Sequence, residues 1–385
     1  MQRTLIVGAG IFGLSTALAL RAKGHAVQVL DPGPIPHPLA SSTDLSKVIR
    51  PDYGADALYT DWMLEALPRW QAWSDRLPRP LYHPTGVAFL AEEPGVAGTF
   101  EADSARLLAE RGLAVEALDA AAIAARFPQW RAGRFRGGHF HRHGGWIEAG
   151  EAVAALAAEA VHAGARIEAG RAALAVHDDG LGVDTAAGPL RADTVIVAAG
   201  AWTPALVPES AALMAPVAQD VFLLRPDDPA AWGDARHPVF GADISRSGWY
   251  GFPIHPTGLL KIAHHGPGRR EDPAGPRETP AARVATLRAF LADALPGLVR
   301  APLAETRVCF YCDTFDGDFL VDRSPARPGL VVVAGGSGHG LKFAPVLGDL
   351  VAAVLDDAPH PARARLSWRV PGPPRQEDAR QRLLG

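Results

Sequence analysis

The stretch Gly8-Ala9-Gly10-Ile11-Phe12-Gly13 decides the fold, because it joins an apolar run at 4–7 to a helical, alanine-rich segment. This order predicts a strand, a tight glycine turn and a helix that together bind a dinucleotide. Gly8 makes the turn, Gly10 lets the backbone approach a pyrophosphate, and Gly13 allows the helix to pack closely on the strand. The N-terminus of the helix then offers free N–H groups to the phosphates.

Asp31 belongs to the same predicted unit. It closes the second expected strand, 21 positions after Gly10, where an acidic side chain can bond the hydroxyl groups of a ribose. A carboxylate at this place disfavours a 2′-phosphate, so FAD or NAD is expected rather than NADP.

The composition excludes several classes of protein. The 385 residues are enough for about two domains, and 38 basic against 42 acidic side chains give a net charge of -4. Without an excess of basic charge, nucleic acid is not an expected partner. The sequence has two cysteines, Cys309 and Cys312, too few for a disulfide scaffold. We find neither a signal peptide nor an apolar run long enough to span a membrane, and we expect a cytoplasmic protein.

Strand and helix signals alternate in an order that predicts two interleaved domains. Apolar runs typical of buried parallel strands stand near the beginning, at 194–199 and at 330–334, separated by antiparallel-looking stretches. We predict an α/β fold, in which a Rossmann-type domain is interleaved with a second, mainly antiparallel β-sheet substrate domain with helices. The predicted boundaries are 1–80, 145–215 and 321–370 for the first domain, 81–144 and 216–320 for the second, and 371–385 for a tail.

Two local features carry weaker signals. We expect a glycine-rich loop over 137–145 and meander strands at 166–168, 173–176 and 182–184. His141-Arg142-His143 in that loop has the spacing of a metal motif, but loop histidines without a special role are commoner, and no metal is predicted. Cys309 and Cys312 fit a buried apolar pair or a CxxC motif, although two cysteines alone cannot complete a tetrahedral zinc site.

Further segments resemble motifs of the D-amino-acid-oxidase-like superfamily of FAD enzymes. The branch is that of monomeric sarcosine oxidase, N-methyltryptophan oxidase, pipecolate oxidase and the fructosyl-amino-acid oxidases, or amadoriases. The resemblance covers nearly the whole chain, from Leu5 to about Leu355, and the motifs follow the order of the family. The segments that carry it are 46–50 (SKVIR), 197–202 (VAAGAW), 249–253 (WYGFP), 260–265 (LKIAHH), 307–313 (RVCFYCD) and 335–348 (GGSGHGLKFAPVLG).

The resemblance implies FAD as the cofactor and a set of residues around it. Cys309 takes the position of the cysteine that bonds the flavin 8-methyl carbon through sulfur, so a covalent FAD is expected. Lys47 stands where sarcosine oxidase has an arginine beside the flavin ring. The residues expected to bind the cofactor are Gly8, Gly10, Ile11, Phe12, Gly13, Asp31, Ser41, Ser42, Lys47, Ala172, Gly200, Trp202, Cys309, Gly336, Gly338, His339, Gly340 and Lys342.

The same resemblance implies roles at the substrate. Arg50 and Lys342 correspond to residues that contact the substrate carboxylate, a task suited to the fork of an arginine. Lys261 corresponds to a lysine at the flavin edge, where its charge promotes the reaction of the reduced flavin with O2. Tyr250, His265 and Tyr311 are expected to shape the pocket.

The function implied is an FAD-dependent oxidase of secondary amines that carry a carboxylate, such as N-alkyl, cyclic or glycated amino acids. Hydride transfer to flavin N5 gives an imine, and O2 then becomes H2O2. The expected partners are this amine and O2, and the chain is expected to be a monomer or a small homo-oligomer. Two alternatives stay open. One is an FAD-dependent dehydrogenase of amino acids or 2-hydroxy acids that passes electrons to a carrier. The other is a non-catalytic flavin-binding sensor or subunit.

Overall fold

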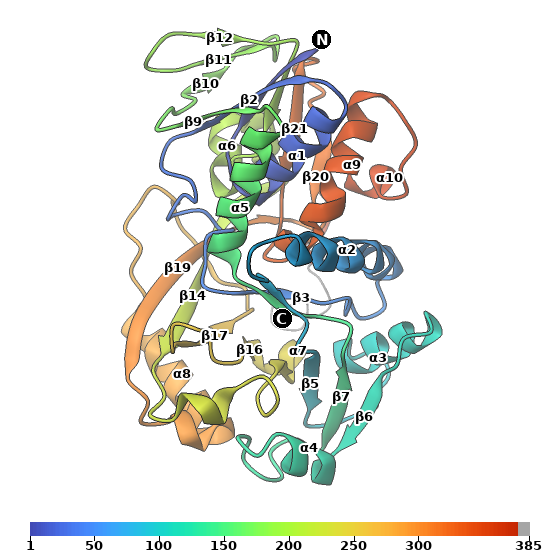
Figure 1. Cartoon of the computed structure of the whole chain (residues 1–385), viewed down its shortest axis with the longest axis vertical. Coiled ribbons are helices and arrows are strands. Elements are labelled where there is room, and N and C mark those ends of the chain that lie inside the picture. Colours follow the sequence, from blue (N-terminus) through green and yellow to red (C-terminus); the bar gives the residue numbers. More distant parts are fainter. Residues whose placement is uncertain (376–385) are drawn as a thin grey trace.

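The computed structural model describes residues 1–375, and their elements are organised around two large sheets, one above the other in Figure 1. The tail predicted for 371–385 lies outside the described residues from 376 on. None of the helices in the described part is long and apolar enough to cross a membrane.

The upper sheet in Figure 1 has six strands in the order β20-β21-β13-β1-β2-β9. Its neighbouring strands run parallel except for the antiparallel pair β20 and β21. The strands are Arg3–Val7 (β1), Ala26–Asp31 (β2), Arg166–Ala169 (β9), Thr194–Val197 (β13), Leu320–Arg323 (β20) and Leu330–Ala334 (β21).

Both faces of this sheet are covered, as a parallel sheet requires. Side chains alternate along β1, so Ile6 packs into the core under three helices while Leu5 and Val7 pack into the core of the opposite face. The three helices are Ile11–Ala22 (α1), Ala149–His162 (α5) and Ala344–Leu355 (α9). The opposite face carries a small sheet of Ala175–Val176 (β10), Gly182–Asp184 (β11) and Leu190–Arg191 (β12).

Helix α2 (Ala57–Asp75) lies between the two large sheets in Figure 1 and packs on α9. The Asp56 side chain caps its N-terminus by accepting a 3.3 Å hydrogen bond from the Tyr59 N–H, a contact that stabilises a helix by about 1 kcal/mol. A second small sheet lies beside this helix and consists of Lys47–Ile49 (β3), Gly145–Ile147 (β8) and Tyr82–His83 (β4).

The lower sheet has nine strands in the order β18-β14-β17-β16-β15-β5-β7-β6, with β19 paired to β14. All its pairs are antiparallel except β5 with β15. The strands are Val87–Ala91 (β5), Glu116–Asp119 (β6), Gly137–His141 (β7), Met214–Leu224 (β14), Val239–Ala242 (β15), Trp249–Gly251 (β16), Leu260–His264 (β17), Arg269–Arg270 (β18) and Leu303–Thr314 (β19).

The remaining elements are short or lie against the lower sheet. The core there is built around aromatic side chains such as Phe222, Phe240 and Trp249. The helices are Phe100–Glu110 (α3), Ala120–Arg126 (α4), Thr203–Leu206 (α6), Ile244–Ser247 (α7), Ala281–Ala294 (α8) and Arg363–Leu366 (α10). The 3₁₀ turns are Gly200–Trp202 (η1), Pro208–Ser210 (η2), Pro229–Trp232 (η3), Pro296–Leu298 (η4) and Leu341–Phe343 (η5).

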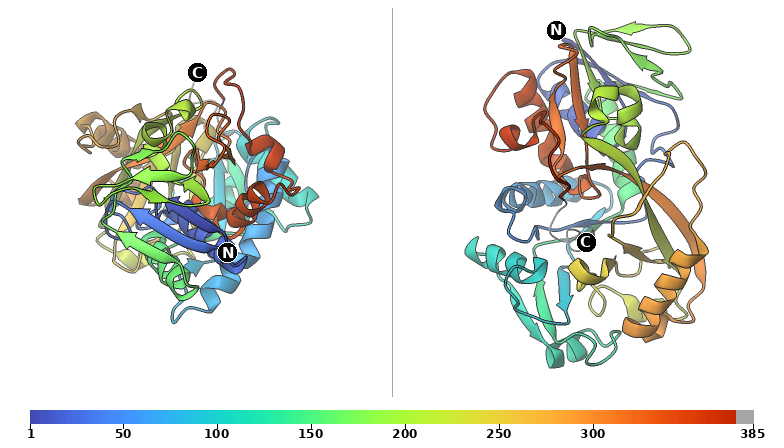
Figure 2. Two further views of the ribbon diagram at one scale, coloured as in Figure 1. Left: turned by 90° about the horizontal axis from the view of Figure 1, so that it is seen from above. Right: turned by 180° about the vertical axis from the view of Figure 1, so that it is seen from behind.

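The long strands β14 and β19 connect the two halves of the molecule, as the view from behind in Figure 2 shows. Met214 at one end of β14 and Cys312 near the end of β19 belong to the core of the six-stranded sheet. Phe222 and Leu224 at the other end of β14 belong to the core of the nine-stranded sheet. One antiparallel ladder therefore sets the position of each core relative to the other.

The predicted fold class is confirmed, because a mainly parallel sheet and a mainly antiparallel sheet alternate along the chain. Two local predictions were wrong. The loop expected over 137–145 contains strands β7 and β8, whose glycines fit close strand pairing: a Cβ at Gly138 would lie 2.0 Å from the Phe89 carbonyl oxygen. Residues 166–168 form β9, which pairs parallel with β2 and not with the meander.

Gly13→Ala should destabilise the protein even without a ligand. A Cβ at Gly13 would lie 1.9 Å from the Gly8 carbonyl oxygen, so α1 would have to move away from the turn. We expect the free energy of unfolding to fall by about 1–3 kcal/mol, measured by urea unfolding of the ligand-free protein. Gly10→Ala is the matched control, since its Cβ would meet only the Ser42 hydroxyl oxygen, at 3.4 Å. An equal decrease in the free energy of unfolding in the two variants would contradict this explanation.

Candidate active site

The glycine turn forms one end of a large cavity on the six-stranded sheet. Gly8 has a φ of +105°, and a Cβ there would lie 2.5 Å from the Ala198 carbonyl oxygen, so the first turn needs glycine. Gly10 is the N-cap of α1 and lines the cavity together with Ile11 and Phe12 of its first turn. Much of the cavity wall is glycine or alanine, from 8–10, 198–201 and 334–340. The backbone is therefore exposed to whatever fills the cavity, as the phosphates and ring of a dinucleotide require.

Asp31 lines this cavity and is held against the turn. One of its carboxylate oxygens accepts a 2.9 Å hydrogen bond from the Ala9 N–H, and the other accepts one of 3.2 Å from the Gly33 N–H. These bonds fix the carboxylate at the end of β2, beside the glycines, where the sequence analysis expects it to meet a ribose.

Most residues predicted to bind the cofactor line the same cavity. Those that do are Gly8, Gly10, Ile11, Phe12, Asp31, Ser41, Ser42, Lys47, Ala172, Gly200, Trp202, Gly336, Gly338 and Gly340. Gly13 instead packs against the turn, and Cys309 lies on β19 and lines neither cavity. His339 and Lys342 line a second cavity.

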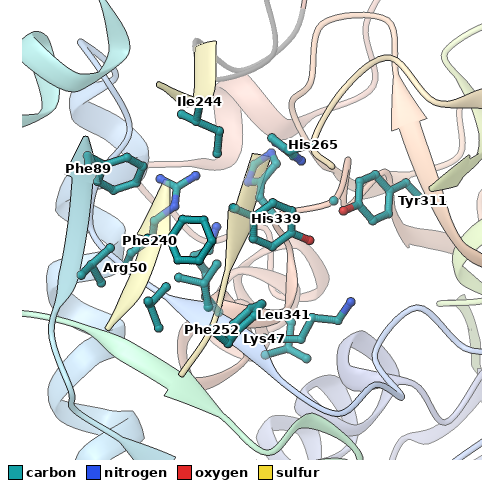
Figure 3. Close-up of a pocket in the computed structure, with 16 residues that line it drawn as sticks. Lys47, Arg50, Phe89, Phe240, Ile244, Phe252, His265, Tyr311, His339 and Leu341 are labelled. Atoms are coloured by element: carbon teal, nitrogen blue, oxygen red, sulfur yellow. The ribbon is translucent and has the colours of Figure 1, made fainter. Parts of the chain in front are cut away.

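The second cavity lies between the nine-stranded sheet and η5. Figure 3 shows Arg50 and Phe89 on one side of it, with His265 and Tyr311 on the other. Among the described residues that line it, five were predicted at the substrate: Arg50, Tyr250, His265, Tyr311 and Lys342. Lys47, Tyr311, Gly338 and Leu341 line both cavities, so the two spaces meet at these residues.

Much of the lining of the second cavity is apolar, and these residues form its apolar wall. Its side chains come mainly from strands β5, β15 and β16 and the residues next to them, and they are Val87, Phe89, Val239, Phe240, Ile244 and Phe252. The sequence analysis missed this apolar wall, because single hydrophobic residues on strands look the same whether they face a core or a cavity.

The lining of this cavity also includes two buried cations. Arg50 is 5% exposed, and its guanidinium lies 5.1 to 5.6 Å from the ring centroids of Tyr53, Phe89 and Phe100. Lys342 is 3% exposed and donates a 2.9 Å hydrogen bond from Nζ to the Tyr53 hydroxyl. The described residues that line this cavity include no carboxylate. A small anion would therefore meet two positive charges in a space with little water.

Tyr53 links Lys342 to a chain of hydrogen bonds that the sequence analysis missed. His339 Nε2 lies 3.0 Å from the Gly317 carbonyl oxygen, which can only accept, so this nitrogen carries the proton. His339 Nδ1 then accepts a 3.0 Å bond from the Tyr53 hydroxyl, whose oxygen accepts from Lys342. Tyr53 stands three residues after Arg50 in the same segment, which is the one signal that could have pointed to it.

Lys261 is the most deeply buried of the predicted catalytic residues and lies outside the lining of both cavities. Its Nζ donates 2.5 Å hydrogen bonds to Asp44 Oδ2 and to the Ser46 carbonyl oxygen. Burial lowers the pKa of Lys261 to about 8, although the Asp44 carboxylate favours the charged form. Lys47 also pairs with Asp44, at 3.0 Å.

Asp44 was missed although it stands three residues before Lys47. Burial alone would raise the pKa of its carboxyl group, but the charges of Lys261 and Lys47 hold that pKa well below its usual range. Asp44 is therefore the anion that allows two lysines to remain charged in the interior. An acid in a loop carries no sequence signal of its own, because its partner Lys261 lies far away in the chain.

Strand β19 presents Cys309 and Tyr311 on the same face, as alternate residues of a strand do. The Cys309 thiol lies 3.9 Å from Lys47 Nζ, which itself lines both cavities. Cys312 lies on the opposite face and lines the first cavity, and burial raises the pKa of its thiol to about 12. Neither cysteine is in a disulfide.

The segment His141-Arg142-His143, for which loop histidines without a special role are expected, does not act as a unit. His141 is buried at the end of β7 and is hydrogen-bonded to Asp52, whereas Arg142 is exposed and His143 is only half-buried. The expectation that these are loop histidines was wrong for His141, because its partner lies almost 90 residues earlier in the chain.

Comparison with known proteins identifies the family. A family model described as FAD dependent oxidoreductase (DAO) matches residues 3–354. N-methyl-L-tryptophan oxidase of Salmonella heidelberg (strain SL476) is 31% identical over 355 residues, which cover 90% of this chain and 93% of that protein. The protein of the same name from Citrobacter koseri is 31% identical over 357 residues, with the same shares covered.

Solved structures agree with this result. Amadoriase II of Aspergillus fumigatus, a deglycating fructosamine oxidase, aligns with a TM-score of 0.83 and 27% identity over 96% of this chain and 89% of that one. A thermally stable mutant of fructosyl peptide oxidase aligns with a TM-score of 0.85 over 99% and 96%, at 24% identity, which supports the fold alone. The family model covers most of the chain, and the chain therefore belongs to the DAO family of FAD-dependent oxidoreductases.

Proposed function

We propose that this chain is an FAD-dependent oxidase of amino acids whose nitrogen is a secondary amine. The observation that carries the proposal is the second cavity, whose described lining combines Arg50 and Lys342 with an apolar wall and contains no carboxylate. This cavity meets the glycine-lined cavity at Lys47 and Tyr311. Relatives named N-methyl-L-tryptophan oxidase and neighbours named amadoriase support a secondary amine as the substrate.

Bound FAD supplies the redox chemistry, in which two electrons pass from the amine to O2, giving H2O2 and an imine that water hydrolyses. The chain itself binds and orients the substrate. Arg50 and Lys342 hold the carboxylate, which directs the amine end of the molecule toward the junction of the two cavities. Tyr250, His265 and Tyr311 close the cavity around that junction and limit the access of water.

The apolar wall favours an apolar substituent or side chain. Phe89, Phe240 and Phe252 offer no acceptor for an ammonium group, and the described lining residues contain no carboxylate that could pair with one. We therefore expect N-alkyl or cyclic amino acids with apolar side chains to be preferred over those that carry a second positive charge.

Lys261 is proposed to hold a positive charge close to the cofactor, where it favours the reaction with O2. The Asp44 carboxylate supports this role because it stabilises the ammonium form in a buried place. The alternative function, a dehydrogenase that passes electrons to a carrier, does not require such a charge, because its reduced flavin does not react with O2. The relatives are themselves named oxidases, which also favours the oxidase over this alternative and over a non-catalytic flavin protein.

We further propose that the FAD is attached through the Cys309 sulfur. Cys309 lies next to Lys47 at the junction of the cavities, and the resemblance to the C-x-Y segment supports the assignment. The remaining proposals are a cytoplasmic location, a monomer or small homo-oligomer, and the division of the chain into two interleaved domains at the predicted boundaries. The two free thiols are in keeping with a reducing compartment.

The substrate class can be tested by anaerobic bleaching of the flavin. N-methyl-L-leucine should bleach it, whereas Nα-methyl-L-lysine and N-methylisoamylamine, which lacks the carboxylate, should do so poorly. In Lys342→Met, the KM for N-methyl-L-leucine should rise about tenfold to hundredfold, because a hydrogen bond to a charged group is worth roughly 1.5–3 kcal/mol.

The matched control for this measurement is Lys23→Met, an exposed lysine paired with Asp356 on the surface. It should leave KM unchanged. An equal KM increase for N-methylisoamylamine in Lys342→Met would contradict carboxylate binding, and bleaching by none of the secondary amines would contradict the proposed function.

The attachment of the flavin predicts opposite results for the two cysteines. Acid precipitation of Cys309→Ser should release the flavin into the supernatant, because no thioether remains to hold it. Cys312→Ser should keep the flavin in the pellet, as the wild type does. The measurement is the absorbance of both fractions, and yellow pellets from Cys309→Ser would rule out this tether.

The charge of Lys261 predicts a pH dependence. Lys261 is charged below its pKa of about 8 and neutral above it, so the reaction of the reduced enzyme with O2 should slow as the pH rises through that value. Asp44→Asn removes the anion that favours the charged form, which lowers this pKa, and the decline should begin at a lower pH. Lys261→Met should slow the reaction roughly a hundredfold at neutral pH.

Stopped-flow measurement separates this step from substrate oxidation. Anaerobic reduction of Lys261→Met by substrate should proceed close to the wild-type rate and serves as the internal control. Reoxidation of Lys261→Met at the wild-type rate would show that the charge has no part in the reaction with O2.

A further inference from the structure

The segment from Arg50 to Tyr53 connects the small sheet to helix α2, and Arg50 at its start lines the substrate cavity. Strand β3 ends at Ile49, which pairs with Gly145, so strand pairing does not extend to these four residues. All four are buried, and Pro51 has no N–H group to contribute to a ladder. A segment of this kind depends on its side chains for a fixed position.

Asp52 provides such a contact. Its side chain is fully buried, and its two carboxylate oxygens lie 3.0 Å from His139 Nε2 and 2.9 Å from His141 Nε2. Burial alone would raise the pKa of Asp52, but the two imidazoles hold that pKa far below its usual range. The carboxylate is therefore ionised and accepts one hydrogen bond from each Nε2–H. Within the described residues, His141 Nδ1 has no hydrogen-bond partner, which fits an imidazole protonated on Nε2 only.

The two histidines belong to the nine-stranded sheet, on strand β7. In the register of β7 with β5, His141 lies opposite Val87 and His139 lies opposite Phe89. Val87 and Phe89 are part of the apolar wall of the substrate cavity. The His139 ring also stacks on Phe89, at 5.4 Å between centroids. Asp52 therefore ties the segment to the strand that pairs with β5, which carries part of the cavity wall.

Both carboxylate-binding cations depend on this segment. Arg50 stands two residues before Asp52, and its guanidinium lies over the Phe89 ring. Tyr53 follows Asp52 directly and accepts the hydrogen bond from Lys342 Nζ. A shift of Asp52 would therefore move Arg50 through the backbone and Lys342 through the Tyr53 hydroxyl.

We propose that Asp52, together with His139 and His141, is a positioning group that fixes the distance between Arg50 and Lys342 for binding of the substrate carboxylate. The inference rests on the proposed function, in which these two cations bind that carboxylate. Asp52 itself touches neither substrate nor cofactor, since it lies outside the lining of both cavities.

The same three residues could in principle hold a metal, because each places one ligand atom within 4.8 Å of the others. The geometry favours hydrogen bonds instead. Each imidazole nitrogen points to a different carboxylate oxygen at hydrogen-bond distance, so the protons already occupy the positions that a metal ion would need. The metal content of the protein is accordingly one readout of the test.

The test compares Asp52→Ala with Asp52→Asn in the holoenzyme. Alanine removes both acceptors. Asparagine keeps one carbonyl oxygen, which can accept from one of the two imidazoles. Its NH2 group can donate to Nε2 of the other imidazole when that ring carries its proton on Nδ1. The probe is 4-methylpentanoate, a carboxylate that cannot be oxidised as an amine, titrated by calorimetry. Its Kd should rise about a hundredfold in Asp52→Ala and about tenfold or less in Asp52→Asn.

His143→Gln is the matched control, because this neighbouring histidine stacks on His141, while the Asp52 carboxylate is hydrogen-bonded to His139 and His141. Its Kd should equal that of the wild type. In turnover, Asp52→Ala should raise the KM for N-methyl-L-leucine with little change in kcat, and should leave kcat/KM for N-methylisoamylamine unchanged.

Several results would overturn the proposal. One is a Kd for 4-methylpentanoate in Asp52→Ala that equals the wild-type value, and another is a Kd in Asp52→Asn that rises as much as in Asp52→Ala. A third is a fall in kcat/KM for N-methylisoamylamine in Asp52→Ala as large as that for N-methyl-L-leucine. A fourth is a stoichiometric metal ion in the wild type that is lost in the Asp52 variants. If Asp52→Ala does not fold, His141→Leu and His141→Gln replace it, and only the leucine variant, which lacks a donor, should weaken binding. Failure of the wild type to oxidise any secondary amine would instead overturn the proposed function.

Discussion

The antiparallel pairing of β14 with β19 determines where the two cavities meet. Its register places Cys309 opposite Gln219 and Tyr311 opposite Val217, while the pairing of β14 with β17 places Lys261 opposite Leu223. One strand thus sets the positions of three residues assigned to the reaction. The same strand begins in the core of the six-stranded sheet and ends in that of the nine-stranded sheet. A rearrangement of either core would therefore shift the residues at the junction of the two cavities.

The buried charges fall into two groups that differ in how they are compensated. Lys261 and Lys47 share the carboxylate of Asp44, so their positive charge is balanced within the protein. Arg50 and Lys342 line a cavity whose described lining contains no carboxylate, and they contact aromatic rings and a tyrosine hydroxyl. The first arrangement suits a permanent buried charge. The second places two cations where the anionic group of a substrate can reach them.

The sequence allowed the parts that depend on local spacing to be predicted. The turn at 8–13 and the apolar strands within 194–199 and at 330–334 lie where the patterns indicated. Asp44, Asp52 and Tyr53 were missed, because each gains its role from a partner that is distant in the chain. The β7 strand was taken for a loop, since its glycines are needed for close strand packing and not for a turn.

The apolar wall has a consequence for how this protein could diversify. Its side chains come from β5, β15 and the residues that follow β15 and β16, whereas the glycine turn and Asp31 belong to the six-stranded sheet. Substitutions on the wall change the volume offered to a substituent on the amine without touching the turn proposed to hold the dinucleotide. Recognition and redox chemistry are thus separable traits, and a lineage can exchange one amine for another by a few mutations while it inherits the oxidising centre intact.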